Sequence, residues 1–374
     1  MSVADPIAVL RPRDEADLAE AVRAANGPLR IEGGGTRPVG GTVEGTALSV
    51  AALSGVVLYE PGALTLVVRA GTPLAEVEAL LAAEGQRLPF EPMDHRALMG
   101  TDGTPTVGGM VATGASGPRR VQAGACRDFL LGARFVDGTG AVVKNGGRVM
   151  KNVTGYDLTR LMAGAHGTLG VLTEVAFKVL PVPEAVVTLA LRGLDDAQAV
   201  AAMAAALGTP FEVTGAAHLP GQGTFLRVEG FADQAAYRAD RLVAALASFG
   251  TAERLADDPW PGIRDVTAFA GRPGDVWRLS PTPSEAPGIV ARAGAEGAVY
   301  DWGGGLVWLL VAPGTDLRAR LGPFAGHATL IRAAPAARAR LGAFHPEAAA
   351  VAALSRGLRA RFDPRGILNP GRMG

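Results

Sequence analysis

Residues 29–37 read Leu-Arg-Ile-Glu-Gly-Gly-Gly-Thr-Arg, a short apolar segment that runs into three consecutive glycines. The apolar beginning is typical of a strand, and the glycines let the following backbone turn so that several N–H groups converge. Such a nest suits phosphate oxygens, and Thr36 would add a hydroxyl donor and Arg37 a positive charge. An ordinary glycine-rich turn explains this stretch equally well. It is neither a Walker A loop nor a GxGxxG that opens a helix, because Pro38 follows.

Two further glycine-rich stretches follow. Residues 103–117 read Gly-Thr-Pro-Thr-Val-Gly-Gly-Met-Val-Ala-Thr-Gly-Ala-Ser-Gly. Their small side chains predict backbone that lies flat against a planar or phosphorylated ligand, and a structureless loop this long is usually functional or disordered. Residues 151–158 (Lys-Asn-Val-Thr-Gly-Tyr-Asp-Leu) and 167–174 (Gly-Thr-Leu-Gly-Val-Leu-Thr-Glu) form the third stretch, which leads into a strand and again offers exposed N–H groups.

Composition restricts the class of protein. The 374 residues include 36 Lys+Arg and 36 Asp+Glu, and 48% are hydrophobic, which predicts roughly two to three folded domains and excludes a mainly disordered chain. Balanced charge argues against broad nucleic-acid or membrane-surface binding. The single cysteine, Cys126, excludes an internal disulfide, a CxxC zinc site and a self-contained iron–sulfur cluster. Residues 1–5 do not resemble a signal peptide, and no apolar stretch approaches the ~20 residues of a membrane span. We therefore expect a soluble, cytoplasmic protein.

Helix and strand signals alternate along the chain. A helix is expected after Asp14, which would cap it, with Gly27 as its left-handed C-cap. A second helix is expected from Pro73, capped by Thr72 and closed by Gly85. The other expected helices are 195–207, 235–249 and 347–362. The expected strands are 29–31, 64–69, 171–182, 186–191, 225–231, 299–302 and 306–311. A hairpin is expected to join 129–136 to 141–144, and 257–287 is expected to be loop.

The order of these motifs resembles a known family. Gly-Gly-Gly-Thr-Arg, Thr-Val-Gly-Gly-Met-Val-Ala-Thr (106–113), 151–158 and 167–174 together resemble the FAD-linked oxidases of the vanillyl-alcohol oxidase and p-cresol methylhydroxylase (PCMH) type. The resemblance covers residues 1 to about 182, and the tail Ile-Leu-Asn-Pro-Gly-Arg (367–372) is similar to the carboxyl end of the same group. Within that group, 151–158, 301–308 and the short length are similar to the FAD-binding E subunits of bacterial glycolate oxidase.

The resemblance implies an α+β fold and three regions. Residues 1–182 would form a PCMH-type FAD-binding domain of two subdomains, 183–335 an α+β cap domain, and 336–374 a C-terminal helix and tail that return to the FAD domain. FAD would extend between the two subdomains, and Asn369 would contact the flavin or lock the tail. The implied FAD-binding residues are Gly33, Gly34, Gly35, Thr36, Arg37, Pro38, Asp102, Thr104, Thr106, Val107, Gly108, Gly109, Gly114, Ala115, Ser116, Gly117, Gly167, Thr168, Gly170, Val171, Leu172 and Asn369.

The sequence also departs from the family pattern. The first glycine loop has no histidine to link the flavin, so we expect non-covalent FAD. The five histidines are widely scattered, so we expect no metal site, and no catalytic residue is identified. His166 stands where a glutamate is usual, and we expect no catalytic role for it. We expect Cys126 to pack in a core.

Three functions remain open at this point. The first is the FAD-binding subunit of a glycolate oxidase complex, with a paralogous flavoprotein and an iron–sulfur subunit as partners and contact with the inner face of the membrane only through them. The second is a free-standing FAD oxidoreductase of a small 2-hydroxy acid or alcohol. The third is a structural subunit with redox-inert FAD. In the second case the residues that would serve the substrate are Arg37, Arg119, Arg127, Lys151 or His95.

Overall fold

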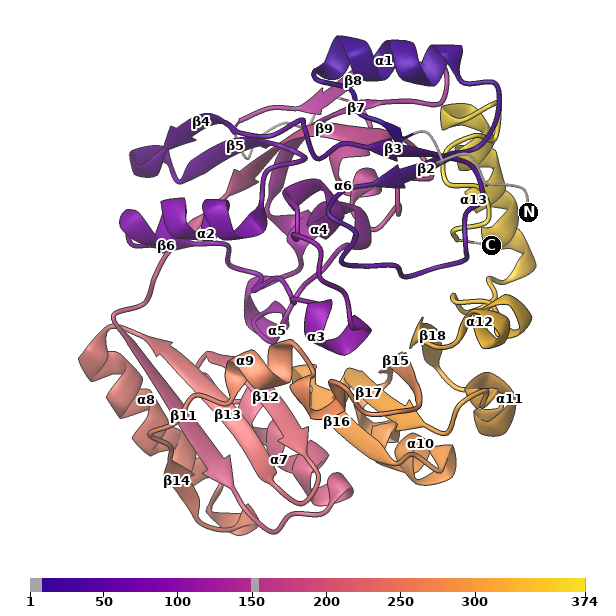
Figure 1. Cartoon of the computed structure of the whole chain (residues 1–374). Helices are drawn as coiled ribbons and strands as arrows, with labels where there is room; N and C mark the ends of the chain where they lie inside the picture. The colour runs from indigo at the N-terminus through magenta and orange to yellow at the C-terminus, as the bar shows by residue number, and fades with distance from the viewer. Residues whose placement is uncertain (1–8, 149–154, 374) are drawn as a thin grey trace.

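The computed structural model describes residues 9–148 and 155–373 (Figure 1). The expected lack of a signal peptide at residues 1–5 and the first half of the 151–158 motif, including Lys151, therefore lie outside the described residues.

Two sheets form the first part of the chain. A small parallel sheet has the order β1-β3-β2, and a five-stranded antiparallel sheet has the order β4-β5-β9-β7-β8. The strands are β1 (Val9–Leu10), β2 (Leu29–Glu32), β3 (Thr46–Ser49), β4 (Val56–Glu60), β5 (Thr65–Arg69), β7 (Leu130–Val136), β8 (Val142–Gly146) and β9 (Val171–Lys178), with β6 (Gln86–Arg87) and β10 (Leu180–Pro181) as a separate pair. The helices are α1 (Glu15–Ala24), α2 (Leu74–Ala83), α3 (Arg96–Met99), α4 (Val107–Thr113), α5 (Arg120–Ala123) and α6 (Leu158–Met162).

An eight-stranded antiparallel sheet forms most of the remainder. Its order is β14-β11-β13-β12-β16-β17-β15-β18, so strands distant in sequence become neighbours. These strands are β11 (Ala185–Leu191), β12 (Val213–Leu219), β13 (Gly223–Gly230), β14 (Ala252–Arg254), β15 (Asp275–Pro281), β16 (Gly297–Asp301), β17 (Leu306–Val311) and β18 (Gly326–Arg332). The helices are α7 (Asp196–Leu207), α8 (Ala232–Ala245), α9 (Trp260–Arg264), α10 (Ala286–Ala293), α11 (Leu317–Leu321), α12 (Pro335–Leu341) and α13 (Ala349–Phe362).

The two faces of this large sheet have different neighbours. Trp277 and Leu279 of β15 pack in a core that includes residues of α7, α8 and α10. Residues of the other face, including Val276 and Trp308, pack with Val39 and Met93 from the first part of the chain. The second face is therefore turned toward the glycine-rich loops, as Figure 1 shows.

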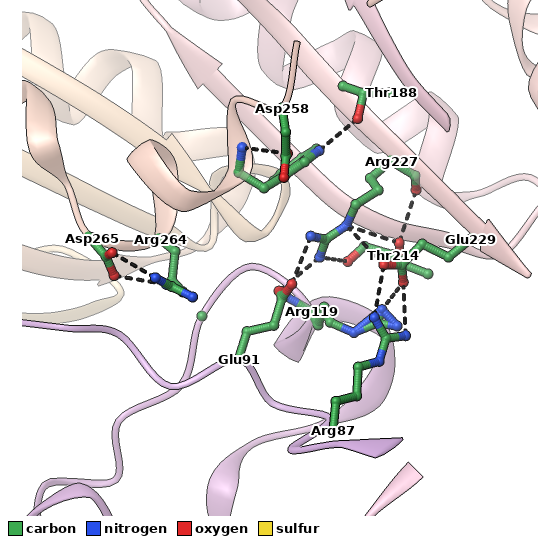
Figure 2. A network of polar contacts seen from close by, with 12 residues as sticks. Arg87, Glu91, Arg119, Thr188, Thr214, Arg227, Glu229, Asp258, Arg264 and Asp265 are labelled. Carbon is green, nitrogen blue, oxygen red and sulfur yellow. Dashed lines mark hydrogen bonds and ion pairs between the residues drawn. The ribbon is translucent and has the colours of Figure 1, made fainter. Parts of the chain in front are cut away.

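A buried ionic network joins the two parts (Figure 2). Arg227 of β13 donates to both carboxylate oxygens of Glu91, at 2.8 Å each. Arg87 and Arg119 both contact Glu229 of the same strand. Because these side chains are largely withdrawn from water, their pairing matters more than that of a surface ion pair. The network fixes how the large sheet sits against the loops.

The C-terminal tail returns to the first sheet. The N–H of Leu29 donates to the carbonyl of Ile367 at 2.7 Å, and the N–H of Asn369 donates to the carbonyl of Leu29 at 3.0 Å. Ile367 and Leu368 are buried with residues of α1 and β2. Residues near the end of the chain thus complete the sheet that carries the first glycine loop.

Most expected elements are present with shifted ends, but the prediction for 257–287 is wrong. That segment contains α9, β15 and the start of α10. Its prolines and glycines lie at boundaries: Pro261 is in the first turn of α9, Gly274 precedes β15, and Pro287 is in the first turn of α10. Proline is compatible with a first helical turn, so these residues delimit elements rather than exclude them.

Smaller predictions also need correction. Residues 103–117 are not structureless, because α4 occupies their centre: the Thr106 hydroxyl caps it by accepting from the Gly109 N–H, and Gly114 ends it with φ +61°. Gly27 is not the C-cap of α1, because the helix ends at Ala24 and its C-cap is Ala25, whose backbone is extended. Thr72 does not cap α2, since its hydroxyl donates to Arg69 instead. Strands β1, β3, β4, β6, β12, β14 and β18 were not predicted.

Candidate functional site

A small cavity of about 220 Å³ lies where β2, the start of α4 and the start of β9 meet. We call it the cradle. Many of the predicted FAD-binding residues line it, although they come from four separate stretches of the chain. They are Gly33, Gly34, Gly35, Thr36, Arg37, Pro38, Thr106, Gly108, Gly109, Gly167, Gly170, Val171, Leu172 and Asn369.

Glycines are required where the two loops of the cradle touch. A Cβ on Gly34 would lie 1.5 Å from the Thr104 carbonyl oxygen, and a Cβ on Gly103 would lie 1.7 Å from the Gly34 carbonyl oxygen. Neither contact can be accommodated without moving backbone. By contrast, a Cβ on Gly35, at φ +71°, would meet nothing within 4 Å. The lack of side chains at Gly34 and Gly103 therefore allows the two loops to touch, and Gly35 leaves the first loop open on the cradle side.

Arg37 brings a largely buried positive charge to the cradle. Its Nε donates to Nδ1 of His95 at 3.3 Å, and an NH2 group donates to the carbonyl of Met93 at 3.1 Å. Burial lowers the pKa of the guanidinium to about 10. Within residues 9–148 and 155–373, no carboxylate forms an ion pair with it. An anion bound in the cradle would compensate this charge.

Asn369 closes the cradle. Its side-chain oxygen accepts from the Ile31 N–H at 2.8 Å, and its side-chain amide donates to the His166 carbonyl at 2.8 Å. Asn369 (φ +44°) and His166 (φ +50°) both adopt left-handed backbone. Such conformations in residues other than glycine persist where the surroundings enforce them, which is common at functional sites.

A larger cavity of about 1320 Å³ adjoins the cradle. The two cavities share Val39, Thr113, His166 and Arg372 in their walls. Among the predicted FAD-binding residues, Gly114, Ala115 and Ser116 line this larger cavity. Asp102, Thr104, Val107, Gly117 and Thr168 line neither, and Val107 is fully buried in the core.

The lining of the large cavity is strongly basic. Glu347 is the one acidic residue that the described part of the chain contributes to it. The arginines in its wall are Arg120, Arg127, Arg278, Arg338, Arg356, Arg359 and Arg372. A cavity with this charge favours anionic ligands.

One wall of the large cavity is a face of the eight-stranded sheet. Arg278 of β15 lies opposite Trp308 of β17 on one side and opposite Thr329 of β18 on the other. All three residues line the cavity. Burial is the main cause that lowers the Arg278 pKa to about 10, and among the described residues it has neither a hydrogen bond nor an ion pair. Its guanidinium is thus available to an anionic ligand.

Trp302 has two arginines close to its ring. The guanidinium carbons of Arg120 and Arg278 lie 4.5 and 5.3 Å from the centroid of its ring, and its indole N–H donates to the Gly117 carbonyl at 3.0 Å. These contacts are within cation–π range. The neighbouring Asp301 is buried, which raises its pKa to about 7.

His327 of β18 is a titratable side chain close to Arg278 in the register. It lies opposite Ser280, two residues beyond Arg278 on β15. Partial burial, followed by Arg278, His345 and Arg120, lowers its pKa. A neutral imidazole is therefore favoured, and a neutral imidazole can accept a proton. No group of three or more His, Cys, Asp or Glu residues within the described ranges is arranged to hold a metal ion.

The other substrate candidates from the sequence are dispersed. Arg127 and His95 line the large cavity, whereas Arg119 lies in the ionic network. His166 lines both cavities, and Cys126 is buried in the core as expected. Sequence reasoning missed Arg278, Trp308, His327 and Thr329 as site residues. Residues 276–279 are apolar except for Arg278, and this pattern is the signal that could have identified Arg278.

Comparison with known proteins agrees with this architecture. A sequence model of the family described as FAD binding domain matches residues 6–146. The chain superposes on p-cresol methylhydroxylase with a TM-score of 0.70 at 13% identity, covering 98% of this chain and 88% of that one. It superposes on 4-ethylphenol oxidase from Gulosibacter chungangensis with a TM-score of 0.70 at 14% identity, covering 100% and 91%. At these identities the structural neighbours support the fold.

Sequence relatives define the family more narrowly. The chain is 37% identical over 349 residues to glycolate oxidase subunit GlcE of Escherichia coli (strain K12), covering 92% of each. It is 30% identical over 190 residues to glycolate oxidase subunit GlcD of Bacillus subtilis (strain 168), covering 49% of this chain and 39% of that one. The family model and these relatives show that the chain is an FAD-linked oxidoreductase. More particularly, the chain belongs to the family of glycolate oxidase subunit GlcE. No helix among the described residues is long and apolar enough to cross a membrane.

Proposed function

We propose that this chain is the FAD-binding subunit of a glycolate oxidase complex, and that its FAD is held without a covalent bond. The residues of the cradle suit a dinucleotide: glycines leave backbone N–H groups uncovered, and the buried Arg37 supplies a charge that the diphosphate would compensate. The residues that would hold FAD are those predicted from the sequence, with Asp102, Thr104, Val107, Gly117 and Thr168 supporting the loops from behind.

The substrate would bind in the large cavity beside the cradle. The observation that carries this assignment is Arg278, a guanidinium with no hydrogen bond or ion pair among the described residues, in a wall shared with Trp308 and Thr329. A guanidinium binds a carboxylate through paired, charge-assisted hydrogen bonds. A small 2-hydroxy acid such as glycolate carries that carboxylate next to its reacting carbon.

The oxidation of glycolate to glyoxylate removes one proton from the hydroxyl oxygen and a hydride equivalent from the carbon. Bound FAD supplies the acceptor for the hydride equivalent. His327 is the proposed acceptor of the proton at Nε2 or Nδ1, since its neutral form is favoured beside Arg278. Arg278 would hold the carboxylate in place, and Trp302 and Trp308 would limit access of water.

Electrons would then leave through partners. The single cysteine cannot hold an iron–sulfur cluster, so an iron–sulfur subunit and a paralogous flavoprotein would complete the enzyme. The complex would work in the cytoplasm, at the inner face of the membrane through its partners. We also propose the three regions 1–182, 183–335 and 336–374, because the large sheet starts at β11 and ends at β18.

A free-standing FAD oxidoreductase is the second candidate, favoured by the fact that Arg278 and His327 belong to this chain. Anaerobic addition of glycolate to the purified chain, with and without co-expressed partner subunits, separates these functions. Loss of the oxidised flavin absorbance without partners supports the free-standing enzyme, and loss only within the complex supports the subunit. A flavin that stays oxidised in both samples contradicts the proposed function and indicates redox-inert FAD.

A further inference from the structure

Helix α13 is unusually exposed for its length. None of its 14 residues is buried. Its C-terminal end is anchored, because the ring of Phe362 lies 6.1 Å from that of Phe135 and the Gly138 N–H donates to the Phe362 carbonyl at 2.8 Å. A helix of this length is marginal in water without a packed face. We therefore expect another surface to pack against the exposed part of α13.

One side of the exposed part is apolar. Val351, Leu354 and Leu358 are 50%, 71% and 42% exposed. Their spacing of three, four and seven residues places them along one side of a helix, the pattern that anchors a helix in an apolar groove. We call these three residues the α13 stripe. Scattered single apolar residues on a surface need no explanation, but three in one row do.

The charge of α13 indicates which kind of surface could cover the α13 stripe. α13 carries Arg356, Arg359 and Arg361 and no acidic residue. Two copies of this chain meeting through α13 would bring arginines together without any carboxylate from either helix, which disfavours a symmetric dimer. A groove whose rim carries carboxylates would complement both the stripe and the charge.

The position of α13 indicates where a protein that covers the stripe would lie. Val351, Ala352, Arg356 and Arg359 line the large cavity, so the helix forms part of its outer wall. Figure 1 shows α13 at the edge of the first part of the molecule, next to α12. A protein that covers the stripe would therefore sit next to the proposed substrate cavity.

We propose that the α13 stripe is the docking surface for a partner protein that presents an apolar groove rimmed by carboxylates. The inference rests on the proposed function in one respect, namely that the partner is another subunit of the same enzyme. The stripe has only three apolar side chains and none of them is aromatic, which favours a protein groove over an anionic membrane surface and makes membrane binding an outcome of the test.

The test uses the full chain co-expressed with the GlcD-type and iron–sulfur subunits of the same organism. The variant carries Leu354→Glu and Leu358→Glu, and the matched control carries Tyr237→Glu, which replaces a 62% exposed aromatic residue on α8. We expect the variant to bind its partners about tenfold more weakly or worse, while the control binds as the unchanged chain does. Arg361→Glu should weaken binding too, and its effect should diminish at high salt.

FAD content is measured on every sample, because substitutions at exposed positions should leave it unchanged. Leu354→Ala with Leu358→Ala provides a milder version that keeps helix propensity. Unchanged affinity of the glutamate variant, or no association of the unchanged chain with either subunit, overturns the proposal. Stripe-dependent binding to phosphatidylglycerol vesicles without any subunit also overturns it, in favour of a membrane surface. An intact complex whose flavin ignores glycolate refutes the proposed function and leaves the docking surface standing.

Discussion

The side-chain oxygen of Asn369 accepts a hydrogen bond from the Ile31 N–H at 2.8 Å, joining residues 338 positions apart in the chain. Through its amide group the same side chain also reaches the His166 carbonyl. One residue of the tail thus ties the strand before the first glycine loop to the loop before β9. The cradle exists as a cavity because the end of the chain closes it.

Asn369→Ala should weaken FAD binding and destabilise the fold. The substitution leaves the Ile31 N–H and the His166 carbonyl without their partner, which costs about 1–3 kcal/mol for a buried group. Thermal unfolding and the FAD retained after gel filtration measure the two effects. Pro364→Ala, at an exposed position of the same tail, is the control. Full FAD retention by Asn369→Ala would show that the tail does not close the cradle.

Gly34→Ala should disrupt the cradle itself. The added Cβ would lie 1.5 Å from the Thr104 carbonyl oxygen, so the loops must separate. We expect loss of FAD and destabilisation of at least about 2 kcal/mol. Gly62→Ala is the matched control, because its Cβ would meet nothing within 4 Å, and we expect a change within about 0.5 kcal/mol. Equal FAD content in the two variants would contradict the loop geometry.

Arg278→Gln should impair substrate binding without loss of FAD. A charge-assisted hydrogen bond to a carboxylate is worth about 1.5–3 kcal/mol, which corresponds to roughly a 10- to 150-fold loss in kcat/KM for glycolate in the assembled enzyme. Arg272→Gln is the control, since this exposed arginine donates to the Glu296 carbonyl away from the cavity. A normal kcat/KM for Arg278→Gln would place the carboxylate elsewhere.

Glu91→Gln should loosen the junction between the large sheet and the loops. It removes the closer of the two carboxylates that face Arg227 and leaves only Glu229, at 3.8 Å, and breaking such a buried pair costs up to about 3–5 kcal/mol. Glu253→Gln breaks an exposed pair with Arg192, and there we expect less than about 1 kcal/mol. Urea unfolding compares the two. Similar losses for both variants would mean that the network does not join the two parts.

The FAD-free chain should lose stability between pH 6.5 and pH 4. Burial, followed by Arg372, lowers the pKa of His166 from 6.5 to about 4. In this window the unfolded chain binds more protons, so the free energy of unfolding falls as the pH drops, by at most about 1.4 kcal/mol per pH unit for this group. His166→Gln should flatten that slope when unfolding is measured by urea at several pH values. An identical slope in the variant would contradict a buried, neutral His166.

Local signals in the sequence were sufficient for much of the first part of the chain. Apolar, β-rich runs predicted β5 and β9, and residues of three glycine-rich stretches line a common cavity, the cradle. The same reasoning failed for α4, where small residues pack as a short helix with Thr106 as its cap. Composition alone does not distinguish a flat loop from a tightly packed helix.

The substrate wall could not be predicted, for a different reason. Arg278, Trp308 and Thr329 come from three strands that are neighbours only through the order β17-β15-β18. Strand pairing of this kind is set by tertiary packing. In addition, the prolines around β15 led to the prediction of a loop where the structure has a strand. The apolar neighbours of Arg278 mark it as part of a buried segment, but they do not show which strands lie beside it or which cavity it lines.

The most direct test of the central claim is the visible spectrum and FAD content of the purified full chain before and after acid precipitation. We predict a yellow protein with about one FAD per chain that passes entirely into the supernatant, as expected for a nest of backbone N–H groups and Arg37 that holds the diphosphate without a covalent bond. A colourless protein that takes up no added FAD would contradict the cradle. Flavin that stays with the precipitate would contradict non-covalent binding.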